Sequence, residues 1–176
     1  MLPLGTKAPA FTLSDASGVA CTLSFHGKAP ATLVVFMCNH CPYVIHLKQH
    51  LSDFCRTYIA KGVQIFGINS NDPGRYAEDG AKGMLADAKR YAYPFPYLID
   101  ETQDVARTYK ATCTPDFFLF DREMKLVYRG QFDSSRPGND KPITGADLGA
   151  AIDAVLAGKP VAVKQFPSMG CSIKWK

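Results

Sequence analysis

Long apolar runs are missing from this sequence. The longest, "TLVVFM" at residues 32–37, has the length of one buried strand and falls far short of the roughly 20 residues that a membrane-spanning helix needs. The opening "MLPLGTKAPAFTLSD" lacks the basic start and apolar stretch of a secretory signal. We therefore expect a cytoplasmic protein with no membrane partner.

Clusters of basic residues are also missing. The chain has 20 Lys and Arg against 16 Asp and Glu, a net charge of +4, and these residues are scattered. A nucleic-acid-binding surface gathers basic side chains on one face, so we expect no nucleic-acid partner. The 176 residues suit one domain with a sizeable core. We predict a single domain over 1–176, with residues 159–176 as a C-terminal tail packed on its body.

A second close pair of cysteines is missing as well. Cys38 and Cys41 lie two residues apart in "FMCNHCPYV", and the other four cysteines are isolated. A structural zinc site needs four ligands, usually two such pairs or a pair with spaced histidines. His46 and His50 have a possible spacing, but no glutamate lies between them. The pattern disfavours a metal site and implies no bound cofactor, which leaves two buried thiols or a redox dithiol.

The hydrophobic pattern predicts an α/β domain with a mixed sheet. Helices are expected where apolar residues recur every three or four positions, strands where β-rich runs or alternation occur. The expected strands are 11–15, 20–25, 31–37, 63–69, 95–100, 116–121 and 125–132. The expected helices are 43–60 with Pro42 in its first turn, 76–92, 102–109 capped by Thr102, and 145–157 capped by Thr144. The first two strands form a hairpin at an edge of the sheet.

The position of the cysteine pair favours redox chemistry. The buried strand delivers Cys38 to a helix start, where unpaired N–H groups and the helix dipole stabilise a thiolate. The two-residue gap lets Cys41 resolve a mixed disulfide. His40, if protonated, would stabilise the Cys38 thiolate further. We therefore expect Cys38 to carry the thiolate and attack, and Cys41 to resolve.

These motifs resemble the thioredoxin-like superfamily, and within it the AhpC/TSA-type redoxin branch. "GTKAPAFTLSD" is similar to that branch's opening, and "LVVFMCNHC" stands in the place of the strand and C-x-x-C site. "CTPDFFLFD" resembles the Thr-Pro turn before the next strand. The resemblance implies a thioredoxin-like fold with an N-terminal hairpin and a redoxin-type insertion near residues 70–100. It also implies that Thr114 and a cis Pro115 support the site, with the adjacent backbone pairing with substrate.

The resemblance implies a thiol–disulfide oxidoreductase. Its partners would be disulfide-containing proteins or small thiols, together with an upstream reductant. A peroxiredoxin-like thiol peroxidase acting on hydroperoxides is the alternative, but its P-x-x-x-[T/S]-x-x-C pattern fails at both cysteines. Counting from Cys41, the proline and threonine positions hold Val34 and Cys38. The arginine of that family falls near Pro115. A non-catalytic redox sensor or interaction protein is a further alternative.

Two cysteines outside the pair are possible third redox thiols. Cys113 stands two residues before Pro115, on or under the same surface if that proline faces the site. Cys171 lies in "MGCSIKWK", in a tail that carries apolar residues and the chain's only tryptophan, Trp175. Such a tail is expected to pack on the body, and Gly170 would permit a bend there. Both thiols are either buried packing residues or members of the redox centre.

Overall fold

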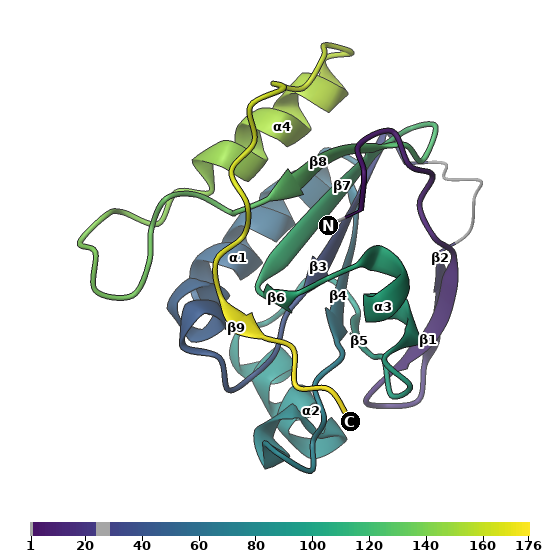
Figure 1. Cartoon of the computed structure of the whole chain (residues 1–176), viewed down its shortest axis with the longest axis vertical. Coiled ribbons are helices and arrows are strands. Elements are labelled where there is room, and N and C mark those ends of the chain that lie inside the picture. Colours follow the sequence, from purple (N-terminus) through teal and green to yellow (C-terminus); the bar gives the residue numbers. More distant parts are fainter. Residues whose placement is uncertain (1, 24–28) are drawn as a thin grey trace.

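A seven-stranded mixed sheet with order β2-β1-β5-β4-β3-β7-β8 forms the centre of the computed structural model, which describes residues 2–23 and 29–176 (Figure 1). The strands of this sheet are β1 Phe11–Asp15, β2 Ala20–Leu23, β3 Ala31–Phe36, β4 Gln64–Asn69, β5 Tyr97–Ile99, β7 Asp116–Asp121 and β8 Leu126–Gly130. The predicted hairpin forms its edge, although residues 24 and 25 of the second expected strand lie outside the described residues. The α/β prediction with a mixed sheet is confirmed.

The middle of the sheet is made by β3, which pairs in parallel with β4 and antiparallel with β7. All six residues of β3 are buried, as expected for a strand covered on both faces. One of these pairs joins Phe36 to Asp116, at the end of β3 and the start of β7. The chain segments that follow β3 and precede β7 are therefore neighbours, and the cysteine turn and Pro115 lie at the same end of the sheet.

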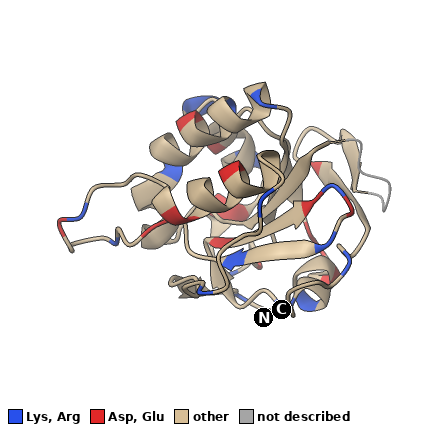
Figure 2. Ribbon diagram, turned by 90° about the horizontal axis from the view of Figure 1, so that it is seen from above, with Lys and Arg blue, Asp and Glu red and all other residues tan. Residues whose placement is uncertain are grey.

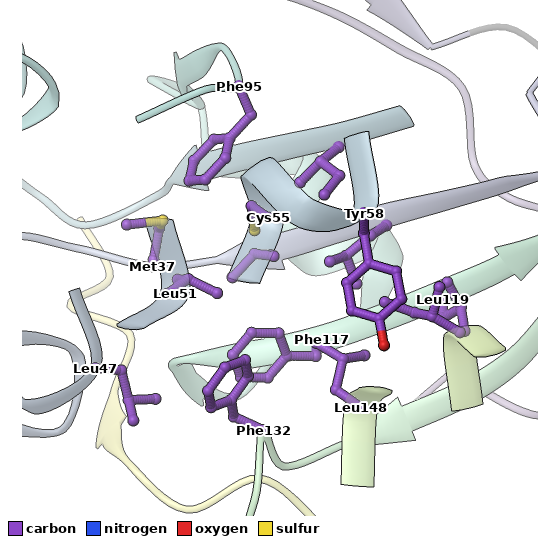
Figure 3. Packing of buried hydrophobic residues seen from close by; sticks show 14 of the residues in the cluster. Met37, Leu47, Leu51, Cys55, Tyr58, Phe95, Phe117, Leu119, Phe132 and Leu148 are labelled. Atoms are coloured by element: carbon purple, nitrogen blue, oxygen red, sulfur yellow. The ribbon is translucent and has the colours of Figure 1, made fainter. Parts of the chain in front are cut away.

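Helices cover the two faces of the sheet unequally. The helices are α1 Pro42–Ala60, α2 Ala81–Arg90, α3 Asp104–Tyr109 and α4 Ala146–Leu156, with a 3₁₀ helix η1 at Ala77–Asp79. Leu51 of α1 and Leu148 of α4 share one core cluster with Phe117 and Leu119, whereas Tyr109 of α3 belongs to a second cluster. Figure 3 shows Phe117 and Phe132 packed beside Leu148, with ring centroids 5.6 Å apart. This packing fixes α1, and hence its N-terminus, against the sheet.

The helix expected over 76–92 is interrupted at Gly80. This residue is extended, with ψ at 166°, and separates η1 from α2. The chain then turns back so closely that a Cβ on Gly83 would lie 2.1 Å from the Glu78 carbonyl oxygen. The interruption turns Asp79 inward, and that side chain is buried. A continuous helix was wrong because the two glycines allow a tighter path.

Two predicted N-caps are displaced by one residue. The N-caps are Gln103 for α3 and Gly145 for α4, both in the left-handed region. The hydroxyls of Thr102 and Thr144 accept hydrogen bonds from the first helical N–H of these helices, at 3.4 and 3.3 Å. The threonines support the helix starts as expected, but from one position further out.

The C-terminal tail, residues 159–176, contacts the rest of the chain through several of its residues. Its strand β9, Cys171–Ser172, pairs with β6, Cys113–Thr114, in a separate two-stranded sheet. Ile173 is buried in the second core cluster, and the Arg107 guanidinium lies 4.6 Å from the centre of the Trp175 ring. In Figure 1 the yellow tail runs from α4 past the end of β7 to the region between α2 and α3.

Charged residues of both signs are interspersed over the described chain (Figure 2). Basic and acidic residues occur together on helices and loops. Among the described residues, no helix combines the length and apolar character needed to cross a membrane.

Candidate active site

The turn between β3 and α1 carries the cysteine pair. Helix α1 begins at Pro42, which makes Cys41 its N-cap residue, and the Cys41 carbonyl accepts hydrogen bonds from the N–H groups of Val44 and Ile45. Pro42 in the first turn confirms the predicted helix start. The side chains of Cys38 and Cys41 are both fully buried. All six cysteines of the chain lie within the described residues, and each is a free thiol.

Thr114, at the end of β6, contacts both thiols. Its hydroxyl lies 3.2 Å from Cys38 Sγ, and its carbonyl oxygen lies 3.2 Å from Cys41 Sγ. The peptide bond from Thr114 to Pro115 is cis, as the resemblance implied. Because the β3–β7 pairing places these segments at one end of the sheet, residues 76 positions apart form one cluster.

The surroundings of the pair favour the thiolate at Cys41. The hydrogen bond from the Cys38 thiol lowers the pKa of Cys41 to about 4, with burial acting in the opposite direction. The Cys171 thiol and the backbone N–H groups of Val44 and Cys171 lower it further. The Thr114 carbonyl opposes this, since it can accept a hydrogen bond only from the protonated form. Several donors surround this sulfur and only one acceptor, so the pKa of Cys41 is lowered.

Cys38 has the opposite preference. Its hydrogen bond to Cys41 raises the pKa of Cys38 far above the ordinary value, and burial and the Asp79 carboxylate act in the same direction. The expectation that Cys38 carries the thiolate is therefore wrong. The helix start itself was predicted correctly, but Cys41 rather than Cys38 is the N-cap residue, and the backbone N–H of Val44 in the first turn lowers the pKa of Cys41.

A buried carboxylate, Asp79, organises the turn and was missed in the sequence. Its Oδ1 accepts hydrogen bonds from the Asn39 N–H at 2.6 Å and from the Asn69 side chain at 3.2 Å. The Tyr97 hydroxyl donates to Asn39 Oδ1 at 2.9 Å. No sequence signal marks this role, because Asp79 lies within the helix expected over 76–92 and reaches the turn only through the break at Gly80.

His40 is held by the same carboxylate. Its Nδ1 lies 2.5 Å from Asp79 Oδ2, and because a carboxylate accepts, Nδ1–H is the donor. The ring stacks on Tyr76 with centroids 3.6 Å apart. Its Nε2 is buried and has no hydrogen-bond partner among the described residues. His40 is thus fixed in orientation, with one ring nitrogen left for chemistry.

One group of donor atoms has the spacing of a metal site. Cys38, His40 and Asp79 each offer an atom within 4.8 Å of the other two. The His40 and Asp79 atoms are already joined by a hydrogen bond, and a closed structural zinc site takes four ligands. The spaced pair His46 and His50 shares no such group among the described residues, and His46 Nε2 lies 2.8 Å from Ser135 Oγ.

A buried lysine supports the turn from α1. Lys48 Nζ donates to the Asn39 carbonyl at 3.1 Å and lies 2.7 Å from Asp87 Oδ2 on α2. Only 4% of its side chain is exposed. The pairing with Asp87 compensates the burial of the ammonium group. Lys48 thus links the turn, α1 and α2, and its place on the buried face of a helix gave no sign of this in the sequence.

The structure brings Cys113 and Cys171 to this region in different ways. Cys113 is buried at the start of β6, and its Sγ lies 3.9 Å from the Pro115 carbonyl oxygen. Burial raises the pKa of Cys113 to about 12. Cys171 faces Thr114 across the β6–β9 pair, and its thiol lowers the pKa of Cys41. The thiol that approaches the pair is thus Cys171.

Comparison with known proteins identifies the family. The model of the AhpC/TSA family matches residues 4–129, so the chain belongs to the AhpC/TSA family. The architecture is a thioredoxin-like fold, with the mixed sheet flanked by helices. This is the class of protein in which redox-active cysteines are expected.

The most informative relatives are redox proteins and a protein of unassigned function. A hypothetical protein from Sinorhizobium meliloti 1021 is 50% identical in its crystal structure, with a TM-score of 0.97 and coverage of 100% of this chain and 96% of that one. The thiol-disulfide oxidoreductase ResA of Geobacillus kaustophilus is 27% identical over 130 residues, 72% of this chain and 70% of ResA. The thioredoxin domain of a Bacteroides vulgatus thiol-disulfide oxidoreductase is 25% identical, with a TM-score of 0.59 and coverage of 77% and 91%. At family level, the chain is similar to thioredoxin-like redox enzymes.

Proposed function

We propose that this protein is a thiol–disulfide oxidoreductase whose redox centre is the Cys38–Cys41 pair. The observation that carries the proposal is the meeting of these two thiols at the start of α1, with pKa shifts in opposite directions. One thiol is held ready as thiolate, and the other keeps its proton. That division suits a nucleophile and a resolving thiol. The substrates we propose are disulfides of proteins or small thiols, and an upstream thiol reductant restores the pair.

The exchange follows from the two pKa directions. The Cys41 thiolate attacks one sulfur of the substrate disulfide, which forms a mixed disulfide and releases the other substrate sulfur as a thiolate. Cys38 then attacks Cys41 Sγ, and the second substrate sulfur leaves. The substrate gains two electrons, and the pair becomes a disulfide. The same steps in reverse oxidise a substrate dithiol.

The proton of Cys38 needs an acceptor during the second step, because the high pKa of this thiol disfavours spontaneous ionisation. The His40–Asp79 pair is the proton acceptor we propose. A ring nitrogen of His40 and a carboxylate oxygen of Asp79 both lie within 4.8 Å of Cys38 Sγ. The Thr114 hydroxyl, 3.2 Å from the same sulfur, orients Cys38 toward Cys41. In this mechanism Asp79 and Thr114 are positioning residues, and the two sulfurs are the catalytic atoms.

Turnover of a model disulfide tests the proposal. The wild-type protein should accelerate insulin reduction by dithiothreitol, and Cys38→Ser and Cys41→Ser should each abolish the acceleration. Cys21→Ser, a partly exposed cysteine of β2, is the matched control and should behave as wild type. Activity that survives in both pair variants would overturn the assignment.

A thiol peroxidase is the second candidate, because Cys41 is a low-pKa thiol at a helix start and is followed by proline. The chain lacks the arginine of the peroxiredoxin family, whose position falls near Pro115. The same set of variants separates the functions. A peroxidase consumes hydrogen peroxide in the presence of a reductant, whereas a redox sensor turns over neither peroxide nor disulfide.

A further inference from the structure

The tail residue Cys171 belongs to the strand that packs over the active site. Strand β9 pairs antiparallel with β6, in a register that places Cys171 opposite Thr114 and Ser172 opposite Cys113. The two backbones approach closely beside this pair. A Cβ on Gly170 would lie 1.9 Å from the Thr114 carbonyl oxygen, so only glycine fits there. Gly170 therefore serves a close backbone approach, and the chain also bends there, as expected from the sequence.

The thiol of Cys171 links the buried pair to the surface. Cys171 faces Thr114, whose carbonyl oxygen lies 3.2 Å from Cys41 Sγ, and the Cys171 thiol and backbone N–H lower the pKa of Cys41. Cys38 and Cys41 are fully buried, whereas Cys171 is partly exposed. Of these three thiols, Cys171 is the one that a large partner can reach in this conformation.

The segment after Cys171 is firmly anchored. Ile173 is buried, and the Lys174 N–H donates to Asn71 Oδ1 at 2.6 Å. The Lys174 carbonyl accepts from the Gln103 side chain and from the Asp72 N–H, both at 2.9 Å. Each such hydrogen bond opposes detachment of the tail. These contacts hold Cys171 in a fixed position beside the site.

We propose that Cys171 is a third catalytic thiol, which relays a disulfide between the buried Cys38–Cys41 pair and an external protein dithiol. This inference rests on the proposed redox function of that pair. It adds the route by which partners reach two sulfurs that have no exposed surface.

The relay conserves electrons and atoms at each step. Beginning from the Cys38–Cys41 disulfide, Cys171 attacks Cys41 Sγ. The Cys41–Cys171 bond forms, the Cys38–Cys41 bond breaks, and Cys38 leaves as a thiolate that takes the proton lost by Cys171. A thiolate of the partner protein then attacks Cys171 Sγ, and Cys41 leaves as a thiolate. The partner's second thiol displaces Cys171, so the partner dithiol becomes a disulfide and Cys38 and Cys41 hold its two electrons.

The charges around the three sulfurs suit this order. Burial, the hydrogen bond to Cys41 and the charge of Cys41 raise the pKa of Cys171 to about 11. The last two causes vanish when Cys41 is in a disulfide, so Cys171 becomes easier to ionise when the pair is oxidised. In the Cys41–Cys171 bond, Cys41 has the lower pKa and is the better leaving group. Attack from outside is therefore directed to Cys171, which is also the accessible sulfur.

Disulfide mapping of the full-length protein tests the relay. Cys38→Ser is oxidised with glutathione disulfide, its free thiols are blocked by alkylation, and its peptides are mapped without reduction. We expect the Cys41–Cys171 bond in most molecules. In a parallel assay, oxidation of a reduced dithiol protein by the oxidised enzyme should slow about tenfold or more in Cys171→Ser, since exchange depends on access to the attacked sulfur. Cys21→Ser is the matched control, and its rate should equal the wild-type rate.

Two results would overturn the relay. One is a Cys38→Ser protein that accumulates glutathione on Cys41 with no bond to Cys171, and the other is a Cys171→Ser protein with the wild-type rate. A further measurement separates this inference from the proposed function. Cys171→Ser and the wild type are equilibrated with reduced and oxidised glutathione, and the fraction of each that holds the Cys38–Cys41 disulfide is measured. An intact pair with an unchanged rate removes only the relay, whereas a wild-type protein that forms no Cys38–Cys41 disulfide removes the proposed function itself.

Discussion

Thr114 and Cys171 face each other as paired residues of β6 and β9, and Thr114 also touches both sulfurs of the Cys38–Cys41 pair. One residue therefore connects the redox centre to the C-terminal tail. Any change in the position of the tail acts on Thr114 directly, and through it on both thiols.

The first prediction concerns the thiolate. We expect Cys41 to remain ionised down to about pH 4, because the Cys38 thiol donates a hydrogen bond to it. The ultraviolet absorbance of the thiolate, followed in a pH titration, should show this transition in the wild type and lose it in Cys41→Ser. Cys38→Ala removes the donor and should move the transition to higher pH. A wild-type thiolate that appears only near pH 8 to 9, the range of a free cysteine, would contradict the assignment.

Removal of the Asp79 charge should slow exchange without disturbing the thiolate. In Asp79→Asn the amide oxygen can still accept from the Asn39 N–H, but the pair with His40 loses its charge. We expect kcat for disulfide exchange to fall about tenfold, in the range of a general acid–base contribution, with a shifted pH profile. The Cys41 titration should stay in place. Asp53→Asn, on the exposed face of α1, is the control, and a loss expressed only in KM would argue against a role in proton transfer.

A methyl group on Gly170 should expose the redox pair. Gly170→Ala places Cβ 1.9 Å from the Thr114 carbonyl oxygen, which forces β9 away from β6. We expect alkylation of reduced Cys38 and Cys41 to accelerate at least about tenfold, since local opening controls access to buried groups. The exposed Ser172→Ala change on the same strand should leave the rates unaltered. Equal protection of the two thiols in both variants would show that the tail does not cover the site.

Peroxide should oxidise this protein slowly in comparison with a peroxiredoxin measured in parallel. The positions that hold the threonine and the arginine of that family contain Cys38 and Pro115, so these groups do not polarise the peroxide. Stopped-flow fluorescence of Trp175, the only tryptophan of the chain, is the measurement. A fast second-order reaction lost in Cys41→Ser alone would promote the peroxidase function over disulfide exchange.

Folding stability should decrease between about pH 4 and pH 6 because of Asp116. Burial raises the pKa of this carboxyl to about 6 from its ordinary value of 3.8. In this window the folded state holds more protons at Asp116 than the unfolded state, so the free energy of unfolding falls as the pH rises. The stability that the protein has with Asp116 protonated is fully lost above pH 6. The difference between a pKa of 3.8 and a pKa of about 6 corresponds to roughly 3 kcal/mol in the free energy of unfolding. Denaturant unfolding of Asp116→Asn should show a gain over wild type that is larger at pH 7 than at pH 4; equal differences at both pH values would exclude this origin.

Much of the fold follows from local patterns. The buried run at 31–37, the helical spacing of 43–60 and the turn residues between strands each specify an element through contacts close in sequence. The pair Cys38 and Cys41 and the turn at Pro115 were likewise visible, because their spacing is a short-range property. The helix expected over 76–92 failed where Gly80 and Gly83 permit a tighter path than the pattern suggests.

Only the tertiary structure decided which sulfur is the thiolate and what surrounds it. The sequence determined that two cysteines lie between a buried strand and a helix, but the structure shows that Cys41 is the N-cap residue of that helix and lies in its N-terminal field. Asp79 and Cys171 reach the pair from 38 residues or more along the chain, through a broken helix and a returning tail. Their approach depends on how the elements pack against one sheet, and no local pattern encodes a distance between segments so far apart in the chain.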